Sequence, residues 1–236
     1  MQFDSQSLAG FYDSPVGQVT RRLLQRRFKA IWPDVHGCRI LGFGFAVPYL
    51  RSFALEADRA IALLPESQGA FRWPEQRGLS AVAEEDEMPF PDALFDRVLM
   101  VHGLETADAV RSLMRQIWRV LAPAGRLLIV VPNRTSLWAQ LERSPFAYGR
   151  PFSRSQIDRL LRDCMFVPEV WDRALLLPPV KSRKLVRTGA AWERVGKILW
   201  PRLAGVHIVE ATKSLYAIAP AGKVRKRRPV LAHARN

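Results

Sequence analysis

The chain has 236 residues, and 48% of them are apolar, which is enough for a folded domain with a full hydrophobic core. No apolar run approaches the roughly 18–20 residues needed to cross a bilayer. The first ten residues lack the basic and apolar regions of a secretory signal. The two cysteines, Cys38 and Cys164, argue against a disulfide framework or a cysteine zinc site. We therefore expect a cytoplasmic protein with no transmembrane segment.

The net charge of +14 is distributed unevenly along the chain. Residues 1–142 carry 16 basic and 16 acidic side chains, whereas residues 143–236 carry 20 basic and 6 acidic ones. An excess of one sign favours an anionic partner, such as a nucleic acid, an acidic protein, an anionic membrane or a phosphorylated or acidic substrate. A solvated basic surface is the alternative interpretation.

Apolar runs of strand length alternate with segments of helical periodicity, which predicts a Rossmann-like α/β fold. The central sheet is expected to be mostly parallel, with helices on both faces and an antiparallel closing strand. Ser153, with Gln156 three residues later, is the predicted N-cap of a late helix. The predicted strands cover residues 39–46, 59–64, 78–83, 95–101, 126–131, 167–180 and 207–217, and the helices cover 5–32, 48–57, 107–121 and 155–162.

Three regions are expected from composition and patterning. Residues 1–36 form an N-terminal helical segment, and residues 37–220 form the main domain. This domain carries a basic insertion around residues 181–205. Residues 221–236 are charged and unpatterned, which is typical of a disordered basic tail.

The segments 88–92 (MPFPD), 95–105 (FDRVLMVHGLE) and 121–133 (LAPAGRLLIVVPN) occur in an order that resembles a known family. This order is similar to the second half of the class I S-adenosylmethionine-dependent methyltransferases, in particular the group acting on small molecules. The resemblance covers residues 37–135 and implies S-adenosylmethionine as the cofactor and a methyl acceptor that the sequence does not specify.

The resemblance also implies where the cofactor binds. The family's glycine-rich turn corresponds to Gly42, Phe43, Gly44 and Ala46, because the backbone must approach the ligand closely there. Glu84 or Glu85 takes the place of an acid near the adenine, and His102 follows the fourth strand at the mouth of the pocket.

The chain departs from the family pattern at several of these positions. Gly42 stands where the family has an acid, and Ala46 and Pro48 stand where it has glycines. The acid that binds the ribose is absent or displaced to Glu66. These departures leave open a second interpretation, a catalytically inactive methyltransferase-like protein that binds a partner through its basic C-terminal part.

His102 is the candidate general base for an acceptor that must lose a proton. The acceptor is expected to lie against residues after the fifth strand, where arginines suit an anionic group. No metal-ligand spacing and no nucleophile elbow occur, and a dinucleotide fingerprint is missing. A nucleic-acid methyltransferase is disfavoured because Val131-Pro132-Asn133 is a poor match to its base-binding motif. The candidate acceptor residues are Asn133, Arg134, Trp138, Tyr148 and Arg150.

Overall fold

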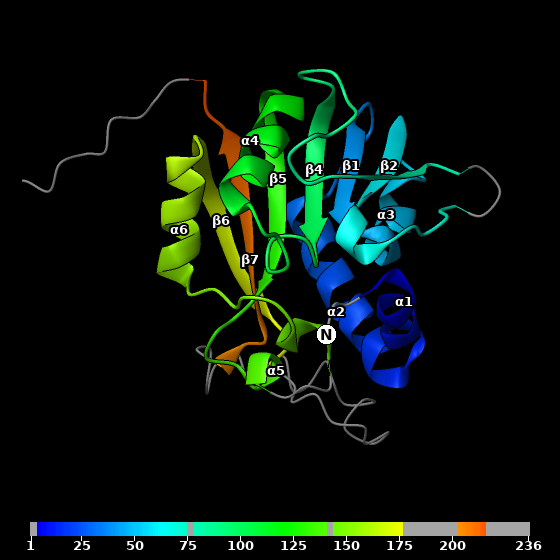
Figure 1. Cartoon of the computed structure of the whole chain (residues 1–236), viewed down its shortest axis with the longest axis vertical. Helices are drawn as coiled ribbons and strands as arrows, with labels where there is room; N and C mark the ends of the chain where they lie inside the picture. Colours follow the sequence, from blue (N-terminus) through cyan, green and yellow to red (C-terminus); the bar gives the residue numbers. More distant parts are fainter. Residues whose placement is uncertain (1–3, 75–77, 141–143, 177–202, 216–236) are drawn as a thin grey trace, which may run out of the picture.

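The structure is a computed structural model and describes residues 4–74, 78–140, 144–176 and 203–215. Within these residues one seven-stranded sheet runs through the molecule, in the order β3-β2-β1-β4-β5-β7-β6. Helices cover it on both faces (Figure 1). The predicted Rossmann-like α/β architecture is confirmed.

The first five strands of the chain run parallel to one another, and the last strand runs antiparallel to both of its neighbours. β7 (Val206–Lys213) pairs antiparallel with β5 on one side and with β6 (Phe166–Ala174) on the other. The reversed strand therefore lies inside the sheet, and β6 forms the edge. The parallel strands are β1 (Arg39–Gly44), β2 (Arg59–Pro65), β3 (Ser80–Ala83), β4 (Phe95–Val101) and β5 (Leu121–Pro132).

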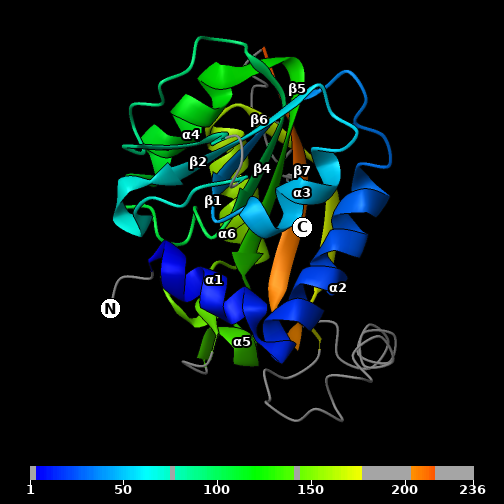
Figure 2. The same cartoon turned by 90° about the vertical axis from the view of Figure 1, so that its right-hand side faces the viewer.

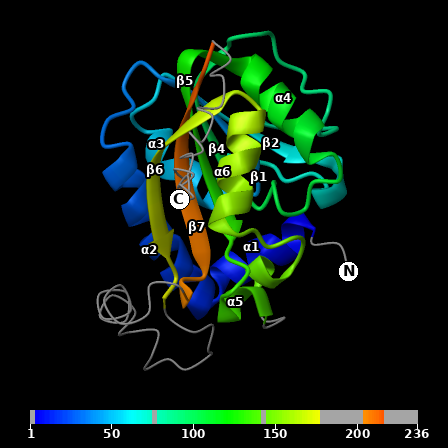
Figure 3. The same cartoon turned by 90° about the vertical axis from the view of Figure 1, so that its left-hand side faces the viewer.

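The two faces of the sheet have separate helix layers (Figures 2 and 3). One face packs against α2 (Pro15–Ile31) and α3 (Val47–Phe53). The other packs against α4 (Val110–Val120) and α6 (Arg154–Asp163). The central strands are buried on both faces, which explains why they are continuous apolar runs in the sequence.

The N-terminal region differs from the single predicted helix over residues 5–32. It forms α1 (Ser5–Asp13) and α2, and Ser14 between them has extended backbone angles, φ −67° and ψ 157°. Pro15 favours this break because it begins a helix well and disfavours a helical residue before it. Helix α1 lies with α5 (Leu137–Gln140) at the end of the sheet to which the arrow of β4 points (Figure 1).

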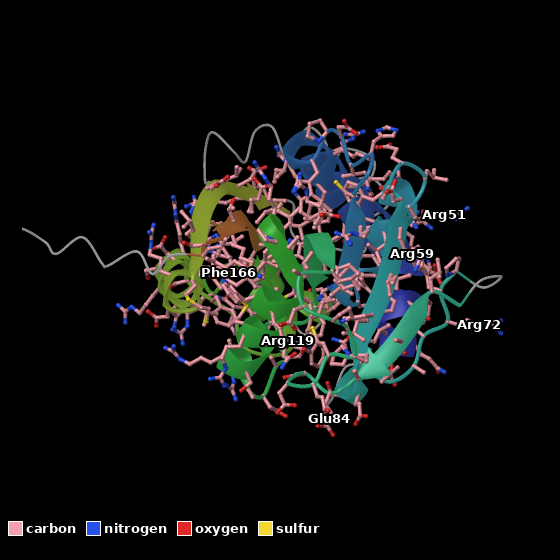
Figure 4. All side chains as sticks on the ribbon, turned by 90° about the horizontal axis from the view of Figure 1, so that it is seen from above. Arg51, Arg59, Arg72, Glu84, Arg119 and Phe166 are labelled. Atoms are coloured by element: carbon pink, nitrogen blue, oxygen red, sulfur yellow. The ribbon has the colours of Figure 1, made fainter. Side chains whose placement is uncertain are left out.

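Two sets of side-chain contacts hold the motif segments in place. Asp96 at the start of β4 accepts hydrogen bonds from the backbone and the side chain of Arg39 at the start of β1. Arg119 of α4, labelled in Figure 4, donates to the carbonyl oxygens of Met88 and Phe90 and to the carboxylate of Asp92. These contacts fasten the 88–92 loop to α4.

The predicted basic insertion around residues 181–205 and the predicted tail over 221–236 lie almost entirely outside the described residues. The capping box at the start of α6 is confirmed, since Ser153 and Gln156 exchange hydrogen bonds with each other's backbone. Across the described ranges, no helix combines the length and the apolar character that a membrane span requires.

Candidate functional site

The candidate site begins at the carboxyl end of β1, where the chain turns sharply toward α3. Gly44 has φ +71°, a conformation that side-chain-bearing residues rarely adopt. A Cβ at this position would meet the backbone oxygen of Val101 at 2.5 Å and the nitrogen of Gly103 at 2.9 Å. The turn therefore requires glycine, because the end of β1 lies directly against the end of β4.

The other positions of the turn are buried among apolar side chains. A Cβ at Gly42 would meet the end of the Leu50 side chain of α3 at 2.5 Å, so a larger residue in this position would require Leu50 to move. Phe45 is 1% exposed, and its ring stacks on Tyr12 at 6.0 Å between centroids. Every residue from 42 to 47 is buried in this conformation.

His102 follows β4 directly and adopts φ +53°. Its backbone oxygen accepts a hydrogen bond from the Gln68 side chain, and its ring lies 4.6 Å from that of Phe146. Only 2% of the residue is exposed. His102 is thus a buried imidazole next to the Gly44 turn.

A chain of four polar side chains passes through this imidazole. The Tyr49 hydroxyl donates to the Tyr12 oxygen at 2.9 Å, and Tyr12 lies 2.9 Å from His102 Nε2. His102 Nδ1 lies 3.2 Å from Glu105 Oε1. A neutral imidazole with its proton on Nδ1 satisfies all three contacts, with Tyr12 donating to Nε2.

All four side chains of this hydrogen-bonded series are buried away from solvent. Burial raises the pKa of Tyr12 and of Tyr49, so both phenols stay protonated over the physiological range. Glu105 is only 2% exposed, so its carboxyl group is buried together with His102. Its carboxylate fixes which nitrogen of His102 carries the proton, and so leaves Nε2 as the basic atom.

Two buried oxygen atoms beside His102 have no hydrogen-bond partner among the described residues. They are Glu105 Oε2 and Gln68 Oε1. An unmet buried acceptor is costly, so such atoms indicate a place where a donor can bind. The ammonium, ribose hydroxyl and adenine amino groups of S-adenosylmethionine are all donors, and the residues present therefore fit this group chemically.

Gln68 is the residue at the end of β2 that sequence reasoning missed. It lies in the short 3-10 turn η1 (Glu66–Gln68) and is 2% exposed, whereas Glu66 is exposed. Its amide oxygen can accept from a ribose hydroxyl where the family has a carboxylate. Glu66 was the sequence candidate for that role, and its side chain is turned to solvent.

The two acids after β3 have different surroundings. Glu84 is exposed at the rim of the molecule (Figure 4). Glu85 is half-buried and accepts a hydrogen bond from the backbone of Asp108, and burial raises its pKa. The contact of Glu85 with the loop before α4 gives it a structural role in this conformation.

The predicted acceptor residues do not all come together. Asn133 is buried and holds the turn after β5 through hydrogen bonds to Ala204 and Thr135. Trp138 packs edge-on against Phe146 of η2 (Pro145–Ala147), which in turn contacts His102. Arg134 and Arg150 are exposed, and Tyr148 is half-buried. Trp138 is therefore linked to His102, whereas Asn133 serves the backbone.

Tyr12, Tyr49 and Phe146 were absent from the sequence prediction because they lie 90, 53 and 44 residues from His102 and follow no local motif. Only the folded chain brings them to the end of β4. The part of the chain that the structure describes holds no cluster of three His, Cys, Asp or Glu side chains suited to a metal ion.

Comparison with known proteins agrees with this geometry. Residues 42–129 match the family model described as a methyltransferase domain. The chain is 28% identical over 113 residues to the ubiquinone/menaquinone biosynthesis C-methyltransferase of Azotobacter vinelandii, over 48% of this chain and 44% of that protein. It is 33% identical over 67 residues to the demethylmenaquinone methyltransferase of Listeria welshimeri, over 28% of each chain. These matches span less than half the length of either relative.

Solved structures share the fold over most of the chain. An S-adenosylmethionine-dependent methyltransferase from Archaeoglobus fulgidus matches with a TM-score of 0.58 and 20% identity, over 82% of this chain and 94% of that one. A methyltransferase from Thermotoga maritima, described as a possible histamine N-methyltransferase, matches with a TM-score of 0.60 and 19% identity, over 89% and 96%.

The sheet order and the fold shared with the solved structures define a Rossmann-like α/β protein. The match over residues 42–129 supports a methyltransferase domain of the class I S-adenosylmethionine-dependent, small-molecule type in this part of the chain. The resemblance seen in the sequence is confirmed, and S-adenosylmethionine is the cofactor of this family.

Proposed function

We propose that the protein transfers a methyl group from S-adenosylmethionine to a small acceptor, using His102 as the general base. The observation that carries this proposal is the His102–Glu105 pair beside the Gly44 turn, with Nδ1 and Oε1 3.2 Å apart. An oriented imidazole at the end of β4 is the arrangement that accepts a proton from a bound nucleophile.

Different residues have different roles in this proposal. The backbone of the Gly44 turn and the amide of Gln68 hold the cofactor, which supplies an electrophilic methyl group on a sulfonium. Trp138 and Phe146 exclude water and support the His102 ring. His102 Nε2 would accept the proton that the acceptor loses as it takes the methyl group.

Arg134 and Arg150 are exposed near this end of the molecule and are suited to bind an anionic group of the acceptor. The acceptor of the relatives named above does not transfer to this chain, because less than half of each relative is matched. A cytoplasmic location stays a prediction.

Titration calorimetry with S-adenosylmethionine and S-adenosylhomocysteine tests the proposal. Micromolar binding, with release of S-adenosylhomocysteine in the presence of an acceptor, is the expected result. Absence of heat at millimolar ligand contradicts it and favours the second candidate function. A His102→Gln variant that binds the cofactor normally but turns over at the wild-type rate removes His102 from the mechanism.

The second candidate is a non-catalytic binding protein, and the charge distribution favours it. The 20 basic and 6 acidic side chains of residues 143–236 suit an acidic protein or a nucleic acid. Binding to such a partner that falls steeply with added salt, without any cofactor binding, is the result that supports this candidate.

A further inference from the structure

The cofactor turn is covered by the protein's own N-terminal helix. Residues 42–47 are all buried, and among them Phe45 is 1% and Ala46 is 0% exposed. Tyr12 of α1 stacks on Phe45, and Phe71 contacts the same ring edge-on at 5.3 Å. A ligand that binds along the turn therefore has to displace side chains that fill the space above it.

Helix α1 is attached in a way that allows it to be displaced. It has nine residues, of which Ser5, Leu8 and Tyr12 are buried, and it joins α2 through the single extended residue Ser14. Helix α2 has seventeen residues and is anchored on the sheet by six buried positions. A change in the backbone angles of Ser14 would move α1 relative to α2, and it would open the close approach of Gly17 in α2 to Phe11 and Tyr12 in α1.

Helix α1 is held in place by the polar hydroxyl group at the end of the Tyr12 side chain. The Tyr12 hydroxyl lies 2.9 Å from both His102 Nε2 and the Tyr49 hydroxyl, at the centre of an otherwise aromatic site. The Ser5 hydroxyl adds a hydrogen bond to the backbone of Ala70. A polar contact suits a reversible closure, because its partners can bond to a ligand or to water when Tyr12 leaves.

The closed state also leaves polar groups unsatisfied. Glu105 Oε2 and Gln68 Oε1 are buried without a partner among the described residues, and both residues bond to His102. A ligand that brings donors to these atoms gains energy that the closed state lacks. The same site therefore has a closed form, filled by Tyr12, and polar atoms that a ligand would satisfy.

We propose that α1 is a gate that competes with the cofactor, and that the Tyr12 phenol is its latch on His102 and Tyr49. This inference rests on the proposed function. Opening also removes the phenol from His102 Nε2, so entry of the cofactor frees the base for the acceptor's proton. The apparent affinity for the cofactor is then its intrinsic affinity reduced by the small fraction of open molecules.

Binding of S-adenosylhomocysteine to the full chain tests the gate. Tyr12→Phe keeps the ring but removes the latch, and leaves His102 Nε2 and the Tyr49 hydroxyl unpaired in the closed state. We expect binding about ten-fold tighter than in the wild type, because the closed state is weakened. Gln6→Ala, at an exposed position of α1, is the matched control and leaves the affinity unchanged.

Hydrogen exchange of the residue 5–13 peptide gives an independent readout. Saturating S-adenosylhomocysteine is expected to increase exchange in α1 while protecting residues 42–47. Slower exchange in α1, or weaker binding by Tyr12→Phe, shows instead that α1 closes over the ligand and overturns the gate while leaving the proposed function intact. Absence of binding by both proteins at millimolar ligand overturns the proposed function and the gate together.

Discussion

Glu105 carries a charge in a place where a charge is expensive, and this gives it a role that can be separated from stability. Its carboxylate is buried, and its Oε1 lies 3.2 Å from the imidazole Nδ1 of His102. A buried carboxylate with so few partners does not contribute to folding. Its contribution is to orient the imidazole and to stabilise the positive charge that the imidazole gains when it accepts a proton.

Glu105→Gln keeps the size and the acceptor atom of this side chain but removes its charge. We expect kcat to fall by about 10- to 100-fold, because the imidazolium is no longer stabilised. The thermal midpoint is expected to stay the same or rise, since a buried charge is lost. Steady-state kinetics and thermal unfolding measured on one preparation separate the two effects. A parallel loss of stability and activity makes Glu105 a structural residue only.

Gly44 is a second residue whose surroundings predict the effect of a substitution, here on the stability of the protein. Gly44→Ala places a Cβ against backbone atoms of Val101 and Gly103 at 2.5 and 2.9 Å, in a residue with φ +71°. Backbone cannot move aside as a side chain can, so we expect a loss of about 2–4 kcal/mol in the free energy of unfolding.

Gly10→Ala is the matched control for Gly44→Ala, because nothing lies within 4 Å of a Cβ at this exposed position of α1. It is expected to stabilise the protein by up to about 1 kcal/mol through helix propensity. Urea unfolding of both variants checks the pair. Equal stability of Gly44→Ala and the wild type contradicts the close approach of β1 and β4.

At the scale of elements, the strand β7 carries a buried histidine, His207, whose pKa is lowered. Burial, and then the positive charges of Arg173 and Arg154, lower the pKa of His207 to about 4. The group is neutral in the folded protein at pH 5, whereas an unfolded histidine has a pKa near 6.5 and is mostly protonated there. Protonation therefore favours the unfolded chain as the pH falls.

We therefore expect the contribution of His207 to the free energy of unfolding to be fully present above pH 6.5 and to be lost as the pH falls from 6.5 to 4. At pH 5 the contribution of His207 to this decline is about 2 kcal/mol. Urea unfolding at pH 7.5 and pH 5 measures it, with His207→Gln as the comparison. A decline of the same size in His207→Gln assigns the pH dependence to other groups.

The elements also show how far the sequence determines the structure. The strand over residues 95–101 and the cap at Ser153 are predicted to the residue, because apolar continuity and capping chemistry act locally. The division of residues 5–32 at Ser14 was missed, although Pro15 indicates it. The predicted helix 48–57 ends at residue 53, where the chain must turn back into β2.

The candidate site divides in the same way between local and non-local causes. Gly44 and His102 follow from their positions after apolar strands, where a parallel sheet places its ligand site. Tyr12, Gln68 and Phe146 reach the same place only through packing of distant segments. Periodicity and spacing do not predict such long-range contacts, so a single sequence could not show that Tyr12 and Phe71 pack over Phe45 of the turn.

At the scale of the whole molecule, the charge and the candidate site lie in different parts of the chain. The Gly44 turn and the hydrogen-bonded chain from Tyr49 to Glu105 lie within residues 1–142, which carry no net charge. Residues 221–236 contain six basic side chains and no acidic ones. The candidate site contains no residue of 221–236, so partner binding and cofactor binding should be separable by removing these last sixteen residues.

Deletion of residues 221–236 is expected to leave the affinity for S-adenosylhomocysteine within about two-fold of the wild type, because this segment contributes no residue to the candidate site and salt screens charge effects on exposed groups. Binding to a single-stranded RNA is expected to weaken, and its dependence on salt to become less steep, since fewer counterions are released. Fluorescence anisotropy at several salt concentrations measures both. An unchanged salt dependence locates RNA binding elsewhere on the protein, and a loss of cofactor affinity links the tail to the site.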